Sequence, residues 1–261
     1  MTTSATMPKR LIDMHNHLWQ DDTSGSRLIE AMDATGVETA LIMGTPGRSN
    51  ENVLAAVAKY PERFTGGAFL DLREGQQAID QLHHYHAEGM RVVKLFPNFG
   101  YYPDDDEFRQ FFDVVAALGM AVLSHCGWLS PAQGVTASYY ARPGRFEKLI
   151  RAYTDTPFIL AHMGGIDGFC EAIMLTTRAP NAYVDLAPGQ GLWVVEFAGK
   201  MAGSIPPEKI MWGMDGYYDP AIIARYQAAL EASGFAEHLE KIFRTNALGI
   251  LQRIGAIKPA G

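Results

Sequence analysis

Two histidines separated by one residue, His15 and His17, stand near the start of the chain in residues 11–17, which read LIDMHNH. Side chains alternate between the two faces of a strand, so both imidazoles would point to the same side. Imidazole nitrogens are frequent ligands of transition metals. A pair with this spacing also arises by chance in a chain with 8 histidines. The pair therefore suggests a metal site but needs further ligands.

Further candidate ligands stand at the ends of three other short apolar runs. These residues are His125, His162 and Asp215. If the runs are parallel strands of one barrel, their carboxyl ends meet in a single ring, where barrel enzymes build their active sites. Three or four neutral imidazoles and one carboxylate suit Zn²⁺, with Fe²⁺, Mn²⁺ or Co²⁺ as alternatives. The sequence thus predicts a metal site at this ring.

The other four histidines show a different pattern. His83, His84 and His86 lie in a helix-compatible stretch, and His238 lies in a second one. None of the four follows an apolar β-type run. We interpret them as side chains on solvated helix faces.

The elements that must position these ligands follow a regular order. Eight β-type runs recur about 30 residues apart, each followed by a helix-compatible stretch. This rhythm, in a chain of 261 residues, predicts a single-domain α/β fold, the (β/α)8 TIM barrel. A doubly wound open sheet is the alternative, although no GxGxxG follows any strand. The expected strands are residues 10–15, 39–43, 64–70, 91–96, 121–125, 158–162, 182–186 and 210–215.

Two of the expected helices have clear end signals. Residues 104–119 begin with acidic side chains, continue with apolar residues at spacings of three and four, and end at Gly119. Residues 27–36 place Leu28, Ile29 and Met32 on one face and stop at Gly36. Each of these helices should bury one face against the sheet.

Composition limits the class of protein. With 48% hydrophobic and 20% charged residues, the chain can bury a large core, which excludes a disordered or collagen-like protein. The net charge of −7 argues against nucleic acid or anionic lipid as a partner. The two cysteines make no disulfide framework and no apolar leader or membrane-spanning run is evident, so we expect a cytoplasmic protein. We expect a flexible N-terminus over residues 1–9 and the barrel over residues 10–261.

The ordered set of motifs resembles the amidohydrolase superfamily. Within it, the set is similar to amidohydrolase family 2, the branch that includes aminocarboxymuconate semialdehyde decarboxylase and several lactonases. The resemblance covers nearly the whole chain, and each motif alone is less specific than the ordered set. The matching segments are residues 12–17, 93–97, 122–125, 160–165, 183–185, 213–215 and 245–247.

The resemblance implies roles for five side chains. His15, His17, His125 and Asp215 would hold one divalent metal ion, usually zinc. His162 would act as an acid or base, or orient the water. A metal lowers the pKa of its bound water toward about 7, and Asp215 can accept the proton that this water releases.

Two further polar residues have more than one interpretation. Asp13 shares the face of His15 and could hydrogen-bond a ligand histidine from beneath, or simply be a polar core residue. Lys94, at the end of the fourth run, could bind a substrate carboxylate, could be carboxylated and bridge two metals as in other branches of the superfamily, or could point outward. The resemblance to family 2 favours a mononuclear site.

Two loops are candidates for contacting the substrate. The segment 126–143 carries Trp128, Tyr140 and Arg142, which could cap the site with aromatic surface and one anion-binding guanidinium. Packing of a long loop explains the same residues equally well. Residues 189–193, with Trp193, could add a rim.

The function favoured at this level is a metal-dependent hydrolase, in which activated water attacks the carbonyl of a small lactone, amide or ester-like substrate. The short segment 18–26 after the first strand favours it over the alternative, a non-hydrolytic decarboxylase of a small aromatic or unsaturated acid. A second alternative is a catalytically inactive binding barrel. The expected partner is a small molecule, and a homodimer is plausible because symmetric homo-oligomers are common.

Overall fold

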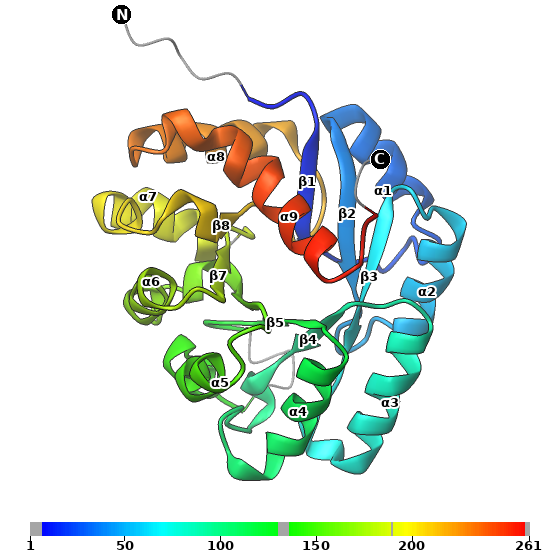
Figure 1. Ribbon diagram of the computed structural model, residues 1–261. Coiled ribbons are helices and arrows are strands. Elements are labelled where there is room, and N and C mark those ends of the chain that lie inside the picture. The colour runs from blue at the N-terminus through cyan, green and yellow to red at the C-terminus, as the bar shows by residue number, and fades with distance from the viewer. Residues whose placement is uncertain (1–6, 130–135, 189, 259–261) are drawn as a thin grey trace, which may run out of the picture.

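A computed structural model describes residues 7–129, 136–188 and 190–258 of the chain. Eight strands form one parallel sheet in the order β1 to β8, and helices surround the sheet (Figure 1). The expected (β/α)8 barrel is therefore confirmed, and the open doubly wound sheet is not found among the described residues. The strands are β1 Leu11–Asn16, β2 Val37–Met43, β3 Phe64–Phe69, β4 Val92–Leu95, β5 Ala121–Ser124, β6 Phe158–Leu160, β7 Ala182–Asp185 and β8 Ile210–Met211.

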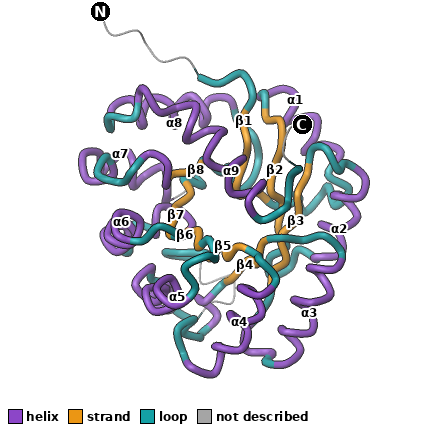
Figure 2. The backbone as a smooth tube through the Cα atoms, viewed as in Figure 1, coloured by secondary structure: helices purple, strands orange, loops and turns teal. Residues whose placement is uncertain are grey.

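The helices alternate with the strands and lie outside them, as the tube trace shows (Figure 2). The helix expected over residues 27–36 forms, whereas in the stretch 104–119 a 3-10 turn at Asp106–Phe108 precedes an α-helix that begins only at Arg109. Leu28 and Met32 of α1 are buried, Ile29 is half-buried, and Gly36 ends the helix with a φ of 75°. The helices are α1 Ser26–Thr35, α2 Asn50–Lys59, α3 Gln76–Ala87, α4 Arg109–Ala117, α5 Glu147–Ala152, α6 Phe169–Arg178, α7 Gln190–Ala202, α8 Pro220–Ala232 and α9 Asn246–Arg253.

All eight expected strands are present, but β6 and β8 end two and four residues before the expected last residues, 162 and 215. β6 stops at Leu160, because His162 adopts a left-handed backbone conformation with φ 57°. β8 stops at Met211, and Asp215, four residues further on, has φ 48°. Both departures from extended backbone occur at candidate site residues, so the chain turns where these side chains must be aimed.

The barrel closes where β8 returns to β1. The amide of Met14 donates to the carbonyl of Trp212 at 3.0 Å, and the amide of Met214 donates to the carbonyl of His15 at 3.1 Å. A Cβ atom at Gly213 would lie only 2.7 Å from Cβ of His15. Glycine at this position therefore permits the close approach that brings the end of β8 beside His15.

The interior of the barrel is apolar at the amino ends of the strands. Ile12, Val92 and Ala121 belong to an interior cluster that also includes Ile250 and Leu251 of α9. Helix α9 therefore covers this end, opposite the strand ends that carry the histidines (Figure 1). Hydrophobic burial of this kind fixes the strands on which the site is built.

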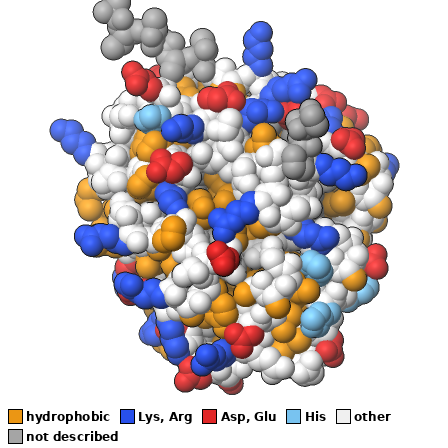
Figure 3. Space-filling model, viewed as in Figure 1, with side chains coloured by type: hydrophobic (Ala, Val, Ile, Leu, Met, Phe, Trp, Pro, Cys, Tyr) orange, Lys and Arg blue, Asp and Glu red, His pale blue; other side chains and the backbone are white. Residues whose placement is uncertain are grey.

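The face that carries α9 shows basic and acidic side chains interspersed, with no continuous area of one sign (Figure 3). Among the helices of the described ranges, none combines the length and apolar character needed to cross a bilayer.

Candidate active site

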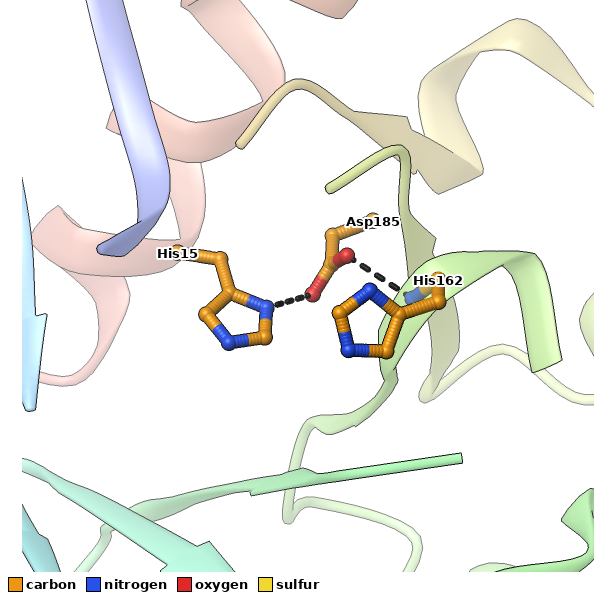
Figure 4. A group of neighbouring side chains, drawn as sticks. All are labelled: His15, His162 and Asp185. Carbon is orange, nitrogen blue, oxygen red and sulfur yellow. Dashed lines mark hydrogen bonds and ion pairs between the residues drawn. The ribbon is translucent and has the colours of Figure 1, made fainter. Parts of the chain in front are cut away.

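His15 is held in one orientation by a carboxylate at the end of β7, two strands away in the closed barrel. Its Nδ1 lies 2.9 Å from Oδ2 of Asp185, which ends β7 (Figure 4). Both side chains are buried. Because an ionised carboxylate only accepts hydrogen bonds, Nδ1 of His15 carries the proton and Nε2 presents a lone pair.

His17 presents the same nitrogen to the same place. Its Nδ1 donates to the carbonyl of Met43 at 2.8 Å, which leaves Nε2 as the lone-pair atom of the neutral ring. This Nε2 lies 3.2 Å from Oδ1 of Asp215, and Nε2 of His15 lies 3.8 Å from the same oxygen. The three candidate ligand atoms all lie within 4.8 Å of one another.

Burial keeps these imidazoles neutral. It lowers the pKa of His15 to about 4, and it also lowers the pKa of His17. The side chain of Asp215 is 29% exposed, and an aspartate carboxyl group is ionised at neutral pH. At neutral pH, two lone pairs and an anionic oxygen therefore face one another.

His125 and His162 complete the ring of imidazoles. Nδ1 of His162 lies 3.3 Å from the carbonyl of Ala187, and its Nε2 lies 3.2 Å from Nδ1 of His125. When Nδ1 of His125 donates to Nε2 of His162, the lone pair of the neutral His125 ring is on Nε2. That atom is buried and has no hydrogen-bond partner among the residues that the structure describes. Burial also holds the pKa of His125 well below its ordinary value.

This set of donors fits a divalent transition metal. Nε2 of His17 and Oδ1 of Asp215 are both acceptors at 3.2 Å, a repulsive contact that a cation between them would relieve. The Nε2 of His125, buried and without a hydrogen-bond partner among the described residues, adds a third imidazole to those of His15 and His17. The predicted ligands His15, His17, His125 and Asp215 therefore line one cavity, and the ligand atoms of His15, His17 and Asp215 lie within 4.8 Å of one another. The described residues contain a second group of this kind, formed by His15, His162 and Asp185.

His162 takes part through its backbone as well as its ring. Its amide donates to Oδ1 of Asp185 at 2.9 Å (Figure 4). The next residue, Met163, has the same left-handed φ of 57°. Left-handed backbone at a residue other than glycine costs on the order of 1–3 kcal/mol. Asp185 thus links a strained turn on one strand to the ring orientation of His15 on another.

Asp13 acts through the backbone, and not on an imidazole. Its Oδ1 accepts from the amides of His15 at 2.9 Å and Met214 at 3.1 Å, and its Oδ2 accepts from Asn16 at 2.7 Å and the Tyr218 hydroxyl at 2.7 Å. Burial outweighs these four bonds and raises the pKa of Asp13 to about 7. The carboxyl group ties the end of β1 to the segment after β8.

Lys94 points into the barrel and is fully buried. Its Nζ lies 2.9 Å from Nε2 of His15 and 4.9 Å from the centre of the Phe96 ring. Burial lowers the pKa of Lys94 to about 8. The ammonium group therefore stands beside the lone pair of His15, within the cavity that His17, His125 and Asp215 also line.

The three loop residues expected to contact substrate lie in different places. Trp128 is exposed and lines a cavity with His125, His162 and Asp215. Tyr140 packs on Tyr102 and lines another cavity, and Arg142 pairs with Glu171 at 2.6 Å. The structure brings only Trp128 to the candidate site. Residues 130–135 of this loop, residue 189 and residues 1–6 lie outside the described ranges.

Sequence reasoning missed two residues of the site. Asp185 lies in one of the quoted motifs, yet no role was predicted for it, although its position at the end of β7 matched that of the other candidates. Arg48 lines the cavity of His15, Lys94 and Asp215, and its Nε is buried with no hydrogen-bond partner in the described part of the chain. Arg48 lies in a loop beyond β2, outside any strand end, so no comparable signal marked it.

The family of the chain follows from comparison with known sequences. The profile of the family described as amidohydrolase matches residues 30–253. The chain therefore belongs to the amidohydrolase family. No curated protein matches the sequence.

Solved structures agree on the fold. An uncharacterized TIM-barrel protein from Bordetella bronchiseptica has a TM-score of 0.71 and 16% identity, over 94% of this chain and 99% of that one. A 2,6-dihydroxybenzoate decarboxylase from Rhizobium has a TM-score of 0.64 and 16% identity, over 95% and 99%. A candidate 2-pyrone-4,6-dicarboxylic acid hydrolase from Pseudomonas putida has a TM-score of 0.64 and 17% identity, over 96% and 99%. At these identities the likeness concerns the fold alone.

Proposed function

We propose that this protein is a metal-dependent hydrolase that adds water to the carbonyl of a small lactone, amide or ester-like substrate carrying a carboxylate. The observation that carries the proposal is the position of Asp215 between two groups. Its Oδ1 faces Nε2 of His17 at 3.2 Å, and its Oδ2 lies 3.8 Å from Nε2 of His162. One carboxylate can thus serve as a ligand on one side and exchange a proton on the other.

His15, His17, His125 and Asp215 would hold the metal ion, most simply Zn²⁺, with Mn²⁺, Fe²⁺ or Co²⁺ as alternatives. When bound, a divalent metal supplies Lewis acidity that polarises a carbonyl and makes water more acidic. Lys94 and Asp185 would then act beside this set of ligands, Asp185 by fixing the tautomer of His15.

Proton transfer is the task of Asp215 and His162. Oδ2 of Asp215 accepts the proton of the attacking water, and Nε2 of His162 can pass a proton onward to the leaving group. The side chain of Asp215 is 29% exposed, whereas His15 and His162 are buried. The carboxylate is therefore the member of the group that a water molecule reaches from the cavity.

The cavity also favours an anionic substrate. Arg48 and Lys94 both line it, and the buried Nε of Arg48 lacks a partner within the described ranges. A guanidinium group with a free N–H edge is suited to a carboxylate. We therefore assign Arg48 and Lys94 to a substrate carboxylate, while Trp128 borders the other side of the centre.

A panel of carboxylate-bearing lactones and esters, with their neutral analogues, tests this function in metal-loaded protein. We expect hydrolysis of the anionic members, lost on Asp215→Asn with the thermal unfolding transition retained. His84→Ala, an exposed histidine on α3, is the matched control and should keep full activity. Hydrolysis that persists in the Asp215→Asn variant would remove that residue from the mechanism.

A decarboxylase is the second candidate, because the same cationic side chains, Arg48 and Lys94, could hold the carboxylate that is to be lost. Release of CO₂ from aromatic acids, with no hydrolysis of any lactone or ester, would favour this reaction. Elemental analysis addresses the third reading, an inactive binding barrel. Protein that takes up less than about a tenth of an equivalent of any transition metal would favour it.

A further inference from the structure

Two cavities open on the same catalytic side chains. The first, of about 290 Å³, is lined by Arg48, Lys94, His15 and His17. The second, of about 490 Å³, contains His162 and a wall of apolar side chains. His125, Leu129 and Asp215 line both. The candidate centre therefore lies at the junction of the two.

The walls of the second cavity are apolar and largely exposed. Trp128 is 64% exposed, Ile166 46% and Trp193 45%. Each belongs to a different segment, following β5, β6 and β7 respectively. Indole and aliphatic surface is costly to leave in water, at roughly 25 cal/mol per Å². Three such side chains around one opening are typical of a surface that an apolar ligand covers.

A single glutamine fixes the backbone of this wall. Oε1 of Gln190 accepts from the amide of Trp128 at 3.0 Å, and its Nε2 donates to the carbonyl of Trp128 at 2.8 Å. Oε1 also accepts from the amide of Ile166 at 3.4 Å. Gln190 begins α7, three residues before Trp193. Gln190 thus joins the segments that carry Trp128, Ile166 and Trp193, while these three apolar side chains stay exposed to solvent.

The two cavities lie on opposite sides of the barrel mouth. Arg48 follows β2 and Lys94 belongs to β4, whereas Ile166 follows β6 and Trp193 follows β7. The strands follow one another around the sheet in chain order, so β2 to β4 face β6 and β7 across the centre (Figure 1). A molecule that occupies both cavities must therefore be anionic at one end, to pair with Arg48 and Lys94, and apolar at the other.

We propose that the substrate is a bipartite acid, with a carboxylate at Arg48 and Lys94 and an aromatic or bulky aliphatic arm lying on Trp128, Ile166 and Trp193. This inference rests on the proposed function and specifies its substrate class. The carbonyl between the two ends is the group placed at Asp215. The second cavity is the larger one, so the arm is the larger part of the molecule.

The reaction on such a molecule is a simple hydrolysis. The oxygen of water bonds to the carbonyl carbon, and the bond between that carbon and the leaving oxygen or nitrogen breaks. One proton of the water passes through Asp215 and His162 to the leaving atom. An ester thus gives an acid and an alcohol, with no oxidant or second reactant.

Two succinate hemiesters isolate the contribution of the arm, because they share the carboxylate and the acyl group. One is the methyl ester and the other the naphthylmethyl ester. For metal-loaded protein we expect kcat/KM to be about tenfold higher for the naphthylmethyl ester, as stacking on indole surface is worth about one factor of ten. Trp193→Ala and Trp128→Ala should each lower this ratio about threefold or more.

Phe197→Ala is the matched control. Phe197 lies four residues beyond Trp193 on α7, is 80% exposed, and is not among the residues that line the cavity. This variant should keep the ratio of the two esters. A ratio near one in the unmodified protein, or an equal loss in Trp193→Ala and Phe197→Ala, would overturn the inference.

Binding separates this inference from the proposed function. In the matched ketones the leaving oxygen is replaced by a methylene group, so no hydrolysis occurs. Calorimetry should show about tenfold tighter binding of the naphthyl ketone than of the ethyl ketone, with the difference lost in Trp193→Ala. If neither ester is hydrolysed but this binding difference appears, the proposed function fails and the bipartite site stands. Equal binding of the two ketones refutes the bipartite site, whatever the activity.

Discussion

Oδ2 of Asp185 lies 2.9 Å from Nδ1 of His15, although the two residues are 170 positions apart in the chain. Its second oxygen accepts from the amides of His162 at 2.9 Å and Ala187 at 3.0 Å. Burial alone would raise the pKa of Asp185, but the imidazole of His15 lowers it to about 2. A permanently ionised group thus sets the tautomer of one histidine and the backbone of another.

Asp185→Asn should weaken metal binding without unfolding the barrel. An asparagine can present its amide N–H to His15 and then favours the tautomer with the proton on Nε2, which blocks the ligand lone pair. Loss of such a supporting carboxylate typically costs about 10- to 100-fold in metal affinity. Competition with a chromophoric chelator measures the affinity, and circular dichroism reports the fold.

Asp113→Asn provides the control for this variant. Asp113 is exposed on α4 and accepts a hydrogen bond from the Tyr153 hydroxyl at 2.8 Å. The substitution therefore replaces a hydrogen-bonded carboxylate by an amide at a position away from the candidate metal site. Its metal affinity should match that of the unmodified protein. If Asp185→Asn binds metal equally well, then the carboxylate does not set the tautomer of His15.

Metal removal should abolish activity reversibly. Dialysis against a chelator should leave a folded, inactive protein, and Zn²⁺, Mn²⁺ or Co²⁺ should restore turnover. His17→Ala should bind substoichiometric metal, because it removes a nitrogen that lies 3.2 Å from Asp215. His83→Ala, exposed on α3, should retain one equivalent. Full activity after exhaustive chelation would argue against a metal-dependent reaction.

The sequence was sufficient for the fold and for the residues at strand ends, because both depend on local patterns. Apolar runs of fixed spacing located all eight strands, and position at a strand end selected His15, His125 and Asp215. The sequence could not predict site residues whose position depends on the path of a loop or on contacts between distant segments of the chain. Arg48 reaches the cavity from a loop, and Asp185 meets His15 only after the sheet has closed.

Arg142 is the opposite case, a loop residue that the sequence predicted for the site but that lies elsewhere. Its residue type suggested an anion site, but the loop that carries it directs the guanidinium to Glu171 and to the carbonyl of Asp167. Residue type alone does not determine which partner a loop side chain meets.

Gly213→Ala should lower the free energy of unfolding, whereas Gly249→Ala, a glycine substitution elsewhere in the same barrel, should not. The new methyl group would lie 2.7 Å from Cβ of His15 and would force β1 and the segment after β8 apart. We expect a loss of about 1–3 kcal/mol of stability, as for other overpacked cores, together with weaker metal binding. Urea denaturation and the chelator competition measure the two effects.

Gly249→Ala is the comparison. Gly249 lies within α9, and a Cβ atom there meets nothing within 4 Å. Alanine in a helix interior is favoured over glycine by roughly 0.5–1 kcal/mol, so this variant should be slightly stabilised. Equal stability of Gly213→Ala and Gly249→Ala would show that the approach of β1 and β8 is not tightly packed.

The buried carboxyl group of Asp13 should make stability depend on pH. Burial raises its pKa from 3.8 to about 7, so between these values the folded protein keeps a proton that the unfolded chain has lost. Its contribution to stability is therefore present below about pH 4 and declines as the pH rises toward 7, by at most about 1.4 kcal/mol per pH unit. Asp13→Asn removes this titration.

Urea unfolding of both proteins at several pH values between 4 and 7 measures the effect. The free energy of unfolding of the unmodified protein, minus that of Asp13→Asn, should become smaller as the pH increases. A difference that stays constant over the window would mean that Asp13 is ionised throughout, with its four hydrogen-bond donors outweighing burial.

Arg48→Met should discriminate between charged and neutral substrates. A hydrogen bond to a charged group is worth about 1.5–3 kcal/mol, so kcat/KM for the methyl hemiester of succinate should fall about tenfold or more. The dimethyl ester lacks the carboxylate and should be affected far less. Arg151→Met is the control, because Arg151 is exposed on α5 and pairs with Glu147 at 2.7 Å. If Arg48→Met slows both esters equally, Arg48 shapes the cavity but does not bind the carboxylate.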